Sequence, residues 1–366
     1  MPSCELYLDH AATSPMRRSV AEKLCHYLLE YPFNSETVYE WGLISKRVLA
    51  EARTEILKKL NWNADLLFTS GGTESNNLAI HALKGKNKGV IWVSQTAHPS
   101  LIKPIKKLED EGWQILDLPI ASTGCVDLEA IKDFPEPNLV AIEWVNSEVG
   151  FIQPISTLSS WLKETYPSSK IVIDAVQGVG KIEMPAWKNV DAFSFSAHKF
   201  GGPIGTGGLA FRPPKQLNPL QLGGGQESGW RSGTIALANI LCMKDALLES
   251  YKQANVATET YQVEGLFVRK EGVEYSSYLG LIDTRPVDGE VLLHQLEAKG
   301  IAMGLGSACQ ASRKKPSLTL QLLGFQGSEA RQTLRMSWSP FTDMKEIEAT
   351  IQTFKQLHQE SSRYFK

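Results

Sequence analysis

The sequence predicts an α/β protein with a large domain, whose mostly parallel sheet is flanked by helices, and a smaller α+β domain. The chain has 366 residues, more than one small hydrophobic core usually organises. Short apolar runs alternate with segments of helical spacing through residues 88–176, which is typical of βαβ units and a parallel sheet. After about residue 245 the pattern changes to charged helices and short strands. We therefore predict a large domain over 14–245 and a small domain made of 1–13 and 246–366.

The elements of the large domain follow in a regular order. Residues 66–83 pass from a strand through two glycines into a helix with apolar periodicity. Residues 191–197 alternate small polar with apolar side chains and lead to Lys199. Between these segments the pattern predicts strands at 88–95, 113–120, 138–145 and 170–176, and helices at 98–112, 127–134 and 155–167.

Composition excludes several classes of protein. Hydrophobic residues make up 42% and charged residues 21%, and the formal net charge is −2, which argues against a general binder of nucleic acids or membrane surfaces. No apolar run approaches the roughly 20 residues that span a bilayer, and the N-terminus lacks the pattern of a signal peptide. Five widely spaced cysteines without a C-x-x-C motif indicate neither a metal site nor a disulfide framework, so we predict a cytoplasmic protein.

Polar residues follow four of the predicted strands, and they suggest a ligand site. These residues are His98, Asn146, Asp174 and Lys199. Ligands of open α/β sheets bind beyond the carboxyl ends of the strands. An acid at the end of an apolar strand needs a cationic or polar partner, and Asp174 is such an acid. Taken singly, each residue also fits a simpler interpretation, such as a solvated lysine or a capping aspartate, but four together indicate a site.

Two glycine-rich segments have different implications. Gly71 and Gly72 precede Thr73 at the start of a predicted helix, where free N–H groups attract an anion, although an ordinary capped helix is an alternative. Residues 205–210, GTGGLA, match a dinucleotide fingerprint. That fingerprint must open a helix, whereas these glycines run into a predicted strand, so we do not expect dinucleotide binding.

The chain resembles the cysteine desulfurases, which are pyridoxal-phosphate enzymes of fold-type I. The resemblance extends from YLDHAATSP at 7–15 to QTLRMSWSP at 332–340 and covers almost the whole chain. The motifs between these two occur in the family's order: TSGGTESNNLAI, TAHPS, WVNSEVG, IDAVQGVGK, SFSAHKFGGPIGTGGL, GGGQESGWRSGT and VDGEVLLHQLEAKGIAMGLGSACQAS.

The resemblance implies how the ring of the pyridoxal phosphate is held. Lys199 would form the Schiff base and move protons at the substrate Cα. Asp174 would pair with the protonated ring nitrogen, which makes the ring an electron sink. Gln177 would contact the phenolic oxygen, and His98 would stack on the ring and act in acid–base steps.

The resemblance also implies roles for residues around the phosphate and the substrate. Gly72, Thr73, Ser196 and His198 would hold the phosphate. Thr234 would reach the phosphate of a second subunit, which implies a homodimer. Asn146 would contact both the cofactor and the carboxylate of the substrate, L-cysteine. Arg335 would hold the same carboxylate, because a guanidinium meets a carboxylate with two parallel hydrogen bonds.

Cys309 distinguishes the desulfurases from other pyridoxal-phosphate enzymes. Its thiolate would take the substrate sulfur as a persulfide, release alanine, and deliver the sulfur to an acceptor or an iron–sulfur scaffold protein. The alternatives are a selenocysteine lyase, a cystine or cysteine lyase, a small aminotransferase, or a non-catalytic relative, which the presence of Lys199, Asp174 and Cys309 disfavours. The other cysteines match no family motif, and we expect them to be structural: Cys4, Cys25, Cys125 and Cys242.

The chain departs from the family pattern at a few positions. Tyr39 stands where the family has a histidine, in NSETVYEWG. In SACQ a glutamine follows the cysteine, where the family usually has serine or threonine. RMSWSP lacks the glycine that the family has after the arginine. The region between Thr234 and Val287 is short.

Overall fold

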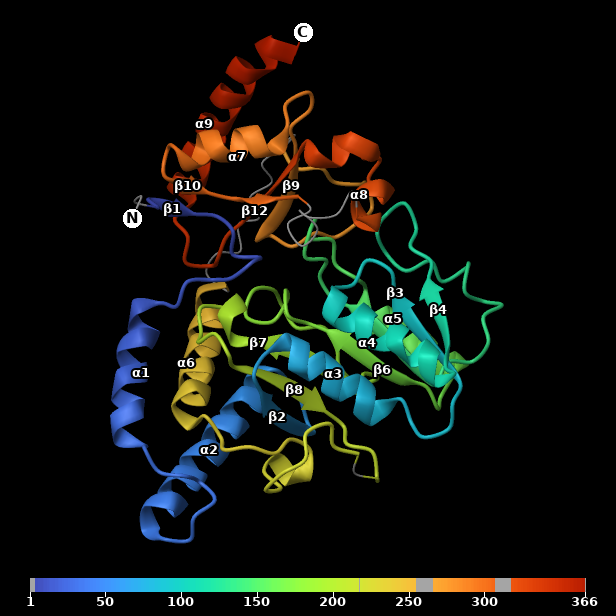
Figure 1. The fold of residues 1–366 in the computed structure, drawn as a ribbon, viewed down its shortest axis with the longest axis vertical. Coiled ribbons are helices and arrows are strands. Elements are labelled where there is room, and N and C mark those ends of the chain that lie inside the picture. Colours follow the sequence, from blue (N-terminus) through green and yellow to red (C-terminus); the bar gives the residue numbers. More distant parts are fainter. Residues whose placement is uncertain (1–3, 217, 255–265, 307–316, 366) are drawn as a thin grey trace.

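A seven-stranded sheet forms the centre of the larger part of the molecule (Figure 1). The computed structural model describes residues 4–216, 218–254, 266–306 and 317–365. Strands β7, β6, β5, β3 and β4 run parallel to one another, while β8 is antiparallel to both of its neighbours. The prediction of a mostly parallel sheet is thereby confirmed. In spatial order the strands are β2 (Asp65–Thr69), β8 (Gly207–Phe211), β7 (Ala192–Ser196), β6 (Lys170–Asp174), β5 (Leu139–Glu143), β3 (Val90–Ser94) and β4 (Gln114–Leu118).

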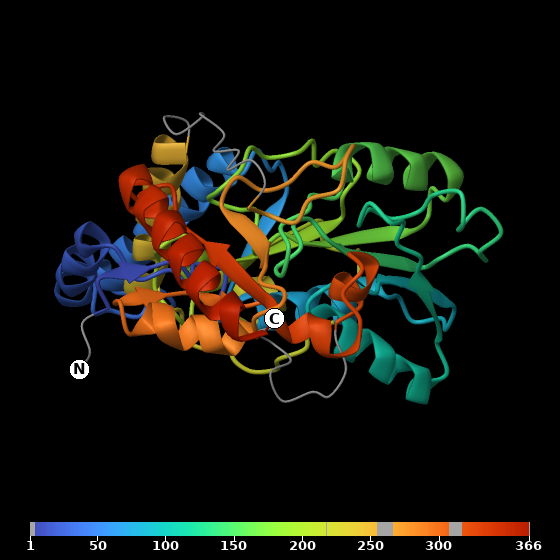
Figure 2. The same ribbon diagram turned by 90° about the horizontal axis from the view of Figure 1, so that it is seen from above.

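Alternate side chains of these strands pack into two separate cores, one on each face of the sheet. Val172 and Ala192 face α3 (Gly72–Leu83) and α4 (Pro99–Lys107). Ile173 and Phe193 face the opposite layer, and Figure 2 shows α4 and α5 on opposite sides of the sheet. The period of two along a strand explains why the inner strands contain almost only apolar residues. The second layer consists of α1 (Arg18–Glu30), α2 (Glu40–Lys59), α5 (Ile155–Thr165) and α6 (Leu237–Ala254).

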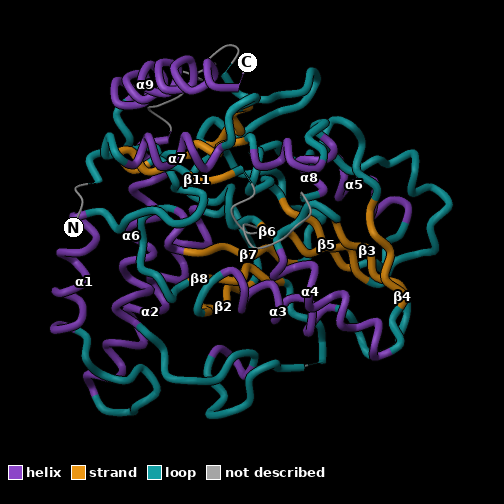
Figure 3. Tube along the Cα trace, turned by 45° about the horizontal axis from the view of Figure 1, so that its top comes forward, coloured by secondary structure: helices purple, strands orange, loops and turns teal. Residues whose placement is uncertain are grey.

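A smaller α+β part lies above the large sheet in the view of Figure 1, and Figure 3 shows it from another angle. Its antiparallel sheet has the order β11-β12-β9, and the N-terminal strand β1 pairs with β10. A third core joins these strands to the helices α7 and α9. The elements are β1 (Leu6–Tyr7), β9 (Leu279–Asp283), α7 (Gly289–Glu297), β10 (Ile301–Ala302), β11 (Gly304–Leu305), α8 (Leu318–Leu322), β12 (Thr333–Ser337) and α9 (Met344–Ser362).

The boundary predicted at residue 245 falls within a helix. Helix α6 continues through this position to Ala254 and packs against α1 and α2. The division of the chain into 14–245 against 1–13 and 246–366 stays a prediction. Within the described ranges, none of the helices is both long enough and apolar enough to cross a membrane.

The helix predicted at 127–134 is wrong. These residues form turns, in which Asp127 Oδ1 accepts from the N–H groups of Glu129 and Ala130, and Phe134 N–H donates to Ile131 O three residues back. The segment is only eight residues long and Pro135 follows it directly. So short a segment gains too few hydrogen bonds to offset helix nucleation, and a proline disfavours helical geometry in the residue before it.

Candidate active site

The ends of β7, β6, β5 and β3 lie side by side in the sheet and open into one pocket of about 220 Å³. The α3 N-terminus and the α4 N-terminus close it from the same face of the sheet. Eight of the predicted site residues line this pocket: Gly72, Thr73, His98, Asp174, Gln177, Ser196, His198 and Lys199. The others that line it are Thr96, Ser100, Glu143, Val145, Ser147 and Val176.

Lys199 is the last residue of a short 3₁₀ turn, Ala197–Lys199, which directly follows β7. Its Nζ donates to the carbonyl oxygens of Ala11 at 2.6 Å and Ala12 at 2.8 Å. Ser14 Oγ donates in turn to the carbonyl oxygen of Lys199 at 3.0 Å. The N-terminal segment therefore holds both the side chain and the backbone of this lysine in the pocket wall.

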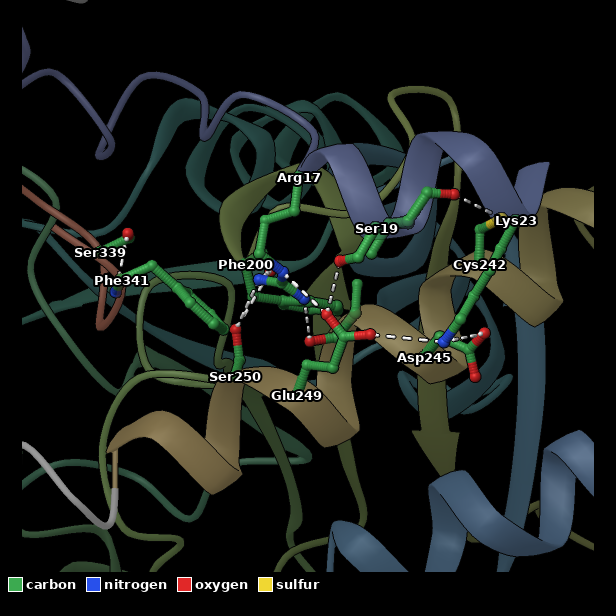
Figure 4. Close-up of polar contacts among 12 residues, drawn as sticks. Arg17, Ser19, Lys23, Phe200, Cys242, Asp245, Glu249, Ser250, Ser339 and Phe341 are labelled. Atoms are coloured by element: carbon green, nitrogen blue, oxygen red, sulfur yellow. Dashed lines mark hydrogen bonds and ion pairs between the residues drawn. The ribbon is translucent and has the colours of Figure 1, made fainter. Parts of the chain in front are cut away.

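Arg17 secures the backbone immediately after the lysine (Figure 4). Its guanidinium donates to Phe200 O at 2.8 Å and to Ala246 O at 2.7 Å, and it pairs with Glu249 at 3.2 Å. The ring of Phe341 covers the guanidinium at 4.3 Å. Because these partners come from distant parts of the chain, Arg17 ties the Lys199 turn to α6 and to the segment after β12.

Asp174 ends β6 with its carboxylate held in place on both oxygens. Asn76 Nδ2 donates to Oδ2 at 2.9 Å, and Val176 N–H donates to Oδ1 at 3.1 Å. Only 6% of Asp174 is exposed. Two neutral donors leave this buried carboxylate without full charge compensation, so it is suited to hold a cationic N–H inside the pocket.

Two histidines of the pocket are held neutral at neutral pH. Removal from water, together with the charges of Lys199 and Lys181, lowers the pKa of His198 to about 4. Burial also lowers the pKa of His98, with Lys199 acting in the same direction and Asp174 against it. His98 Nδ1 accepts from the N–H of Ser100 at 3.1 Å at the start of α4, which fixes the ring. Both imidazoles can therefore accept a proton.

The start of α3 forms the end of the pocket suited to an anion. Gly72 begins this helix, and a Cβ placed there would lie 2.6 Å from Val176 Cγ2, so only glycine allows the approach. Thr73 and Ser196 bring hydroxyl groups to the same place. N–H groups and hydroxyls at a helix N-terminus are a typical phosphate site.

Four predicted site residues do not line the pocket. Asn146 is buried nearby, but its Oδ1 accepts from Glu148 and Val149 N–H groups and its Nδ2 donates to Thr96 O. Arg335 is 3% exposed and pairs with Asp9 at 2.7 Å and with Ser147 O at 2.9 Å. Thr234 is exposed outside the pocket, and Cys309 lies outside the described residues.

Sequence reasoning missed Glu143, the acid that ends β5. It is 3% exposed, Thr96 Oγ1 donates to its Oε1, and its Oε2 is buried without a partner among the described residues. Burial raises its pKa to about 7, against the hydrogen bonds from Ser94 and Thr96 that lower it. The signal was present, because Glu143 ends an apolar strand as Asp174 does. Asn76 was also missed, since nothing in its helix marks it as the partner of Asp174.

Comparison with known proteins identifies the family. The family model for Aminotransferase class-V matches residues 6–350. The chain belongs to the class-V aminotransferase family. This membership agrees with the position of Lys199 and Asp174 at neighbouring strand ends.

Within the class-V aminotransferases, the chain belongs with the cysteine desulfurases. It is 34% identical to cysteine desulfurase IscS of Dictyoglomus turgidum, over 96% of this chain and 94% of the relative. It is 32% identical to the IscS of Dechloromonas aromatica, over 97% of this chain and 91% of that relative. A solved NifS-like protein superposes with a TM-score of 0.86 at 25% identity, covering 96% of this chain and 98% of the other. The recognition of the family from its motifs is confirmed.

The residues present in this class-V chain fit pyridoxal phosphate. The pocket combines a primary amine, a buried carboxylate that forms no ion pair within the described ranges, and a helix N-terminus with hydroxyl groups. These three features match the aldehyde, the ring nitrogen and the phosphate of that cofactor. Among the residues that the structure describes, no cluster of three histidine, cysteine or acidic side chains could hold a metal ion.

Proposed function

We propose that this protein is a pyridoxal-phosphate-dependent cysteine desulfurase that converts L-cysteine to L-alanine and holds the sulfur as a persulfide on Cys309. The observation that carries the proposal is the position of two residues in one pocket. Lys199 follows β7, Asp174 ends the adjacent strand β6, and the α3 N-terminus lines the same pocket. Full-length similarity to cysteine desulfurases supports the choice of substrate.

Different side chains of the pocket would bind the cofactor and transfer protons. Pyridoxal phosphate, when bound, supplies an electron sink that loosens the bonds at the Cα and Cβ of cysteine. The amine of Lys199 would anchor the cofactor covalently and carry the proton to and from Cα. Asp174 would keep the ring nitrogen protonated, and the neutral imidazole of His98 would accept and return a proton beside the ring.

Cys309 would act as the nucleophile of the sulfur transfer. Its thiolate would attack the sulfur of bound cysteine, so that a sulfur–sulfur bond forms while the carbon–sulfur bond breaks. The electron pair of the broken bond stays on carbon, which then takes a proton and leaves as alanine. Atoms and electrons balance without an external oxidant, and the sulfur remains on the protein as a persulfide.

Arg335 and Asn146 would recognise the substrate carboxylate. Arg335 Nε is buried without a partner among the described residues, while its Nη2 pairs with Asp9 and its Nη1 donates to Ser147 O. A carboxylate arriving from the pocket would satisfy Nε and compete with Asp9 for the same guanidinium.

The active unit would be a homodimer. Large apolar side chains are exposed on the loop between α1 and α2, on the start of α2 and on the loops before α6, including Val38 at 88%, Trp41 at 58% and Leu222 at 84%. In Figure 1 these loops lie on the side of the molecule away from the smaller part. Apolar patches of this kind mark interfaces, and the exposed Thr234 would complete the phosphate site of the partner.

The sulfur would pass from Cys309 to an acceptor or iron–sulfur scaffold protein, and the residues Arg313, Lys314 and Lys315 that follow suit an acidic docking partner. A persulfide carrier needs reduced thiols, so we place the protein in the cytoplasm.

The deciding experiment is incubation of purified protein and pyridoxal phosphate with L-cysteine, with alanine and sulfide measured together. A desulfurase gives alanine, and with a reductant present it gives sulfide in equal amount. Sulfide with pyruvate and ammonia would indicate a lyase instead. Absence of any product would refute the proposed function.

A further inference from the structure

Lys181 is a buried cation that the chemistry above does not use. Its side chain is 4% exposed, and its Nζ donates to Gln177 Oε1 at 3.1 Å. Within the described ranges no carboxylate forms an ion pair with it. A buried lysine without an acidic partner is destabilising, so its presence calls for a reason.

The backbone between the two residues fixes their relative position. Gln177 and Lys181 lie in the turns after β6, where Gly178 N–H donates to Ala175 O and Lys181 N–H to Gly178 O. A Cβ at Gly178 would lie 2.2 Å from the Trp144 ring, so the turn packs directly against that side chain. The contact between Lys181 and Gln177 is therefore set by a rigid turn.

The orientation of the Gln177 amide follows from hydrogen-bond chemistry. Lys181 can only donate when charged, so it must face the amide oxygen. Ala11 O can only accept, and it receives Gln177 Nε2 at 2.9 Å. Rotating the amide by half a turn would set donor against donor and acceptor against acceptor, and would lose both bonds. The second N–H of Nε2 has no partner among the described residues, and Gln177 lines the pocket.

We propose that Lys181 is a positioning residue, which locks the Gln177 amide so that an N–H, rather than the carbonyl oxygen, faces the phenolic oxygen of bound pyridoxal phosphate. A negatively charged oxygen gains from this donor and would be repelled by the carbonyl. The charge of Lys181 itself lies behind the amide and acts in the same direction. This inference rests on the proposed cofactor but concerns how the chain tunes it.

Electrostatic surroundings support the assignment. Burial, together with the charges of Lys199 and Arg335, lowers the pKa of Lys181 to about 7. The pKa of His10 falls to about 4, first through burial and then through Lys181, so His10 adds no charge. An anionic oxygen in front of Gln177 would offset this local excess of positive charge. The arrangement thus favours the ionised phenolic oxygen over the neutral one.

The test compares cofactor affinity and the pH midpoint of the bound cofactor's visible absorption in Lys181→Met, Lys181→Arg and Gln177→Ala. Lys181→Met should weaken cofactor binding about tenfold and raise the midpoint by about one pH unit, because the phenolic oxygen loses its oriented donor. Lys181→Arg keeps a donor and should restore most of both values. Lys188→Met, which removes an exposed lysine seven residues away, should change neither.

The double variant Lys181→Met/Gln177→Ala separates positioning from charge alone. If Lys181 acts through the amide, then Lys181→Met should have little further effect in the Gln177→Ala background. An equal midpoint shift in both backgrounds would overturn the positioning role, and an unchanged midpoint in Lys181→Met would overturn the inference as a whole. A purely structural role would lower the unfolding midpoint and leave the absorption titration unmoved. If the parent protein binds no pyridoxal phosphate, the proposed function itself fails, which is a distinct result.

Discussion

Glu143 on β5 is paired with Asp174 on β6 in the parallel register of the sheet. Paired residues of adjacent strands point to the same face, so two carboxyl groups are set side by side in the lining of one pocket. The two differ in their hydrogen bonds, because Asp174 accepts on both oxygens while Oε2 of Glu143 has no partner in the described part of the chain. Burial raises the pKa of Glu143 to about 7, so this carboxyl group holds its proton to a higher pH than an exposed glutamate does.

Glu143→Gln should remove a pH-dependent loss of stability. Burial raises the pKa of Glu143 to about 7 in the folded protein, so the native state binds this proton more tightly than the unfolded chain does. The contribution of Glu143 to stability is therefore fully present below pH 4.5 and falls as the pH rises to about 7. Relative to the parent, Glu143→Gln should gain up to about 3 kcal/mol in free energy of unfolding between pH 5 and pH 8.

Denaturant unfolding at both pH values measures this difference. Glu164→Gln, which alters an exposed acid on α5, serves as the control and should show the same difference from the parent at each pH. A Glu143→Gln difference that does not change with pH would contradict a raised pKa.

Lys199 should be the residue that carries the cofactor. Its amine lies in the pocket wall at the end of β7, beside the carboxylate-bearing end of β6. Borohydride reduction of the yellow protein, followed by peptide mapping, should find the label on Lys199. A label on Lys181, the buried lysine that donates to the pocket-lining Gln177, would reverse the assignment of the two lysines.

Cys309→Ser should separate sulfur transfer from cofactor binding. The variant keeps Lys199 and Asp174, so it should bind pyridoxal phosphate and change its absorption when cysteine is added. Alanine production and protein-bound persulfide should fall by at least about a hundredfold, because a hydroxyl cannot take up the sulfur. The matched controls should retain most of the turnover: Cys4→Ser, Cys25→Ser, Cys125→Ser and Cys242→Ser. Alanine formation at the parent rate in Cys309→Ser would favour a lyase.

Trp41→Glu and Val38→Glu should shift the protein from dimer to monomer in sedimentation experiments. Both side chains are exposed and apolar, and a charge on each would remain unpaired at an interface. Thr234→Ala should leave the dimer intact and weaken cofactor retention, since the hydroxyl would serve the partner's phosphate. A parent protein that sediments as a monomer and retains pyridoxal phosphate normally would contradict the shared site.

The mostly parallel sheet could be predicted from local pattern, and so could most of the residues that line the pocket, whereas the spatial order of the strands came from the structure. His98, Asp174 and Lys199 were identified because polar residues follow short apolar strands, and the ends of parallel strands meet at one edge of a sheet. The same local reasoning failed at 127–134, where helical spacing is present but a following proline and the short length favour turns. Cys309 and its loop lie outside the described residues, so its role stays a prediction from the family motif.

Sequence by itself determined the fold class, the family and most of the candidate site residues, because these depend on residue types and their spacing along the chain. Only the tertiary structure decided which groups are partners: Asn76 donates to Asp174 across 98 positions, and Arg335 pairs with Asp9 across 326. It also decided that Glu143 is buried with one oxygen that has no partner among the described residues, and that Lys181 donates to the Gln177 amide. Burial and the identity of the nearest donor set the protonation of these groups, and both depend on neighbours that folding brings together from distant positions.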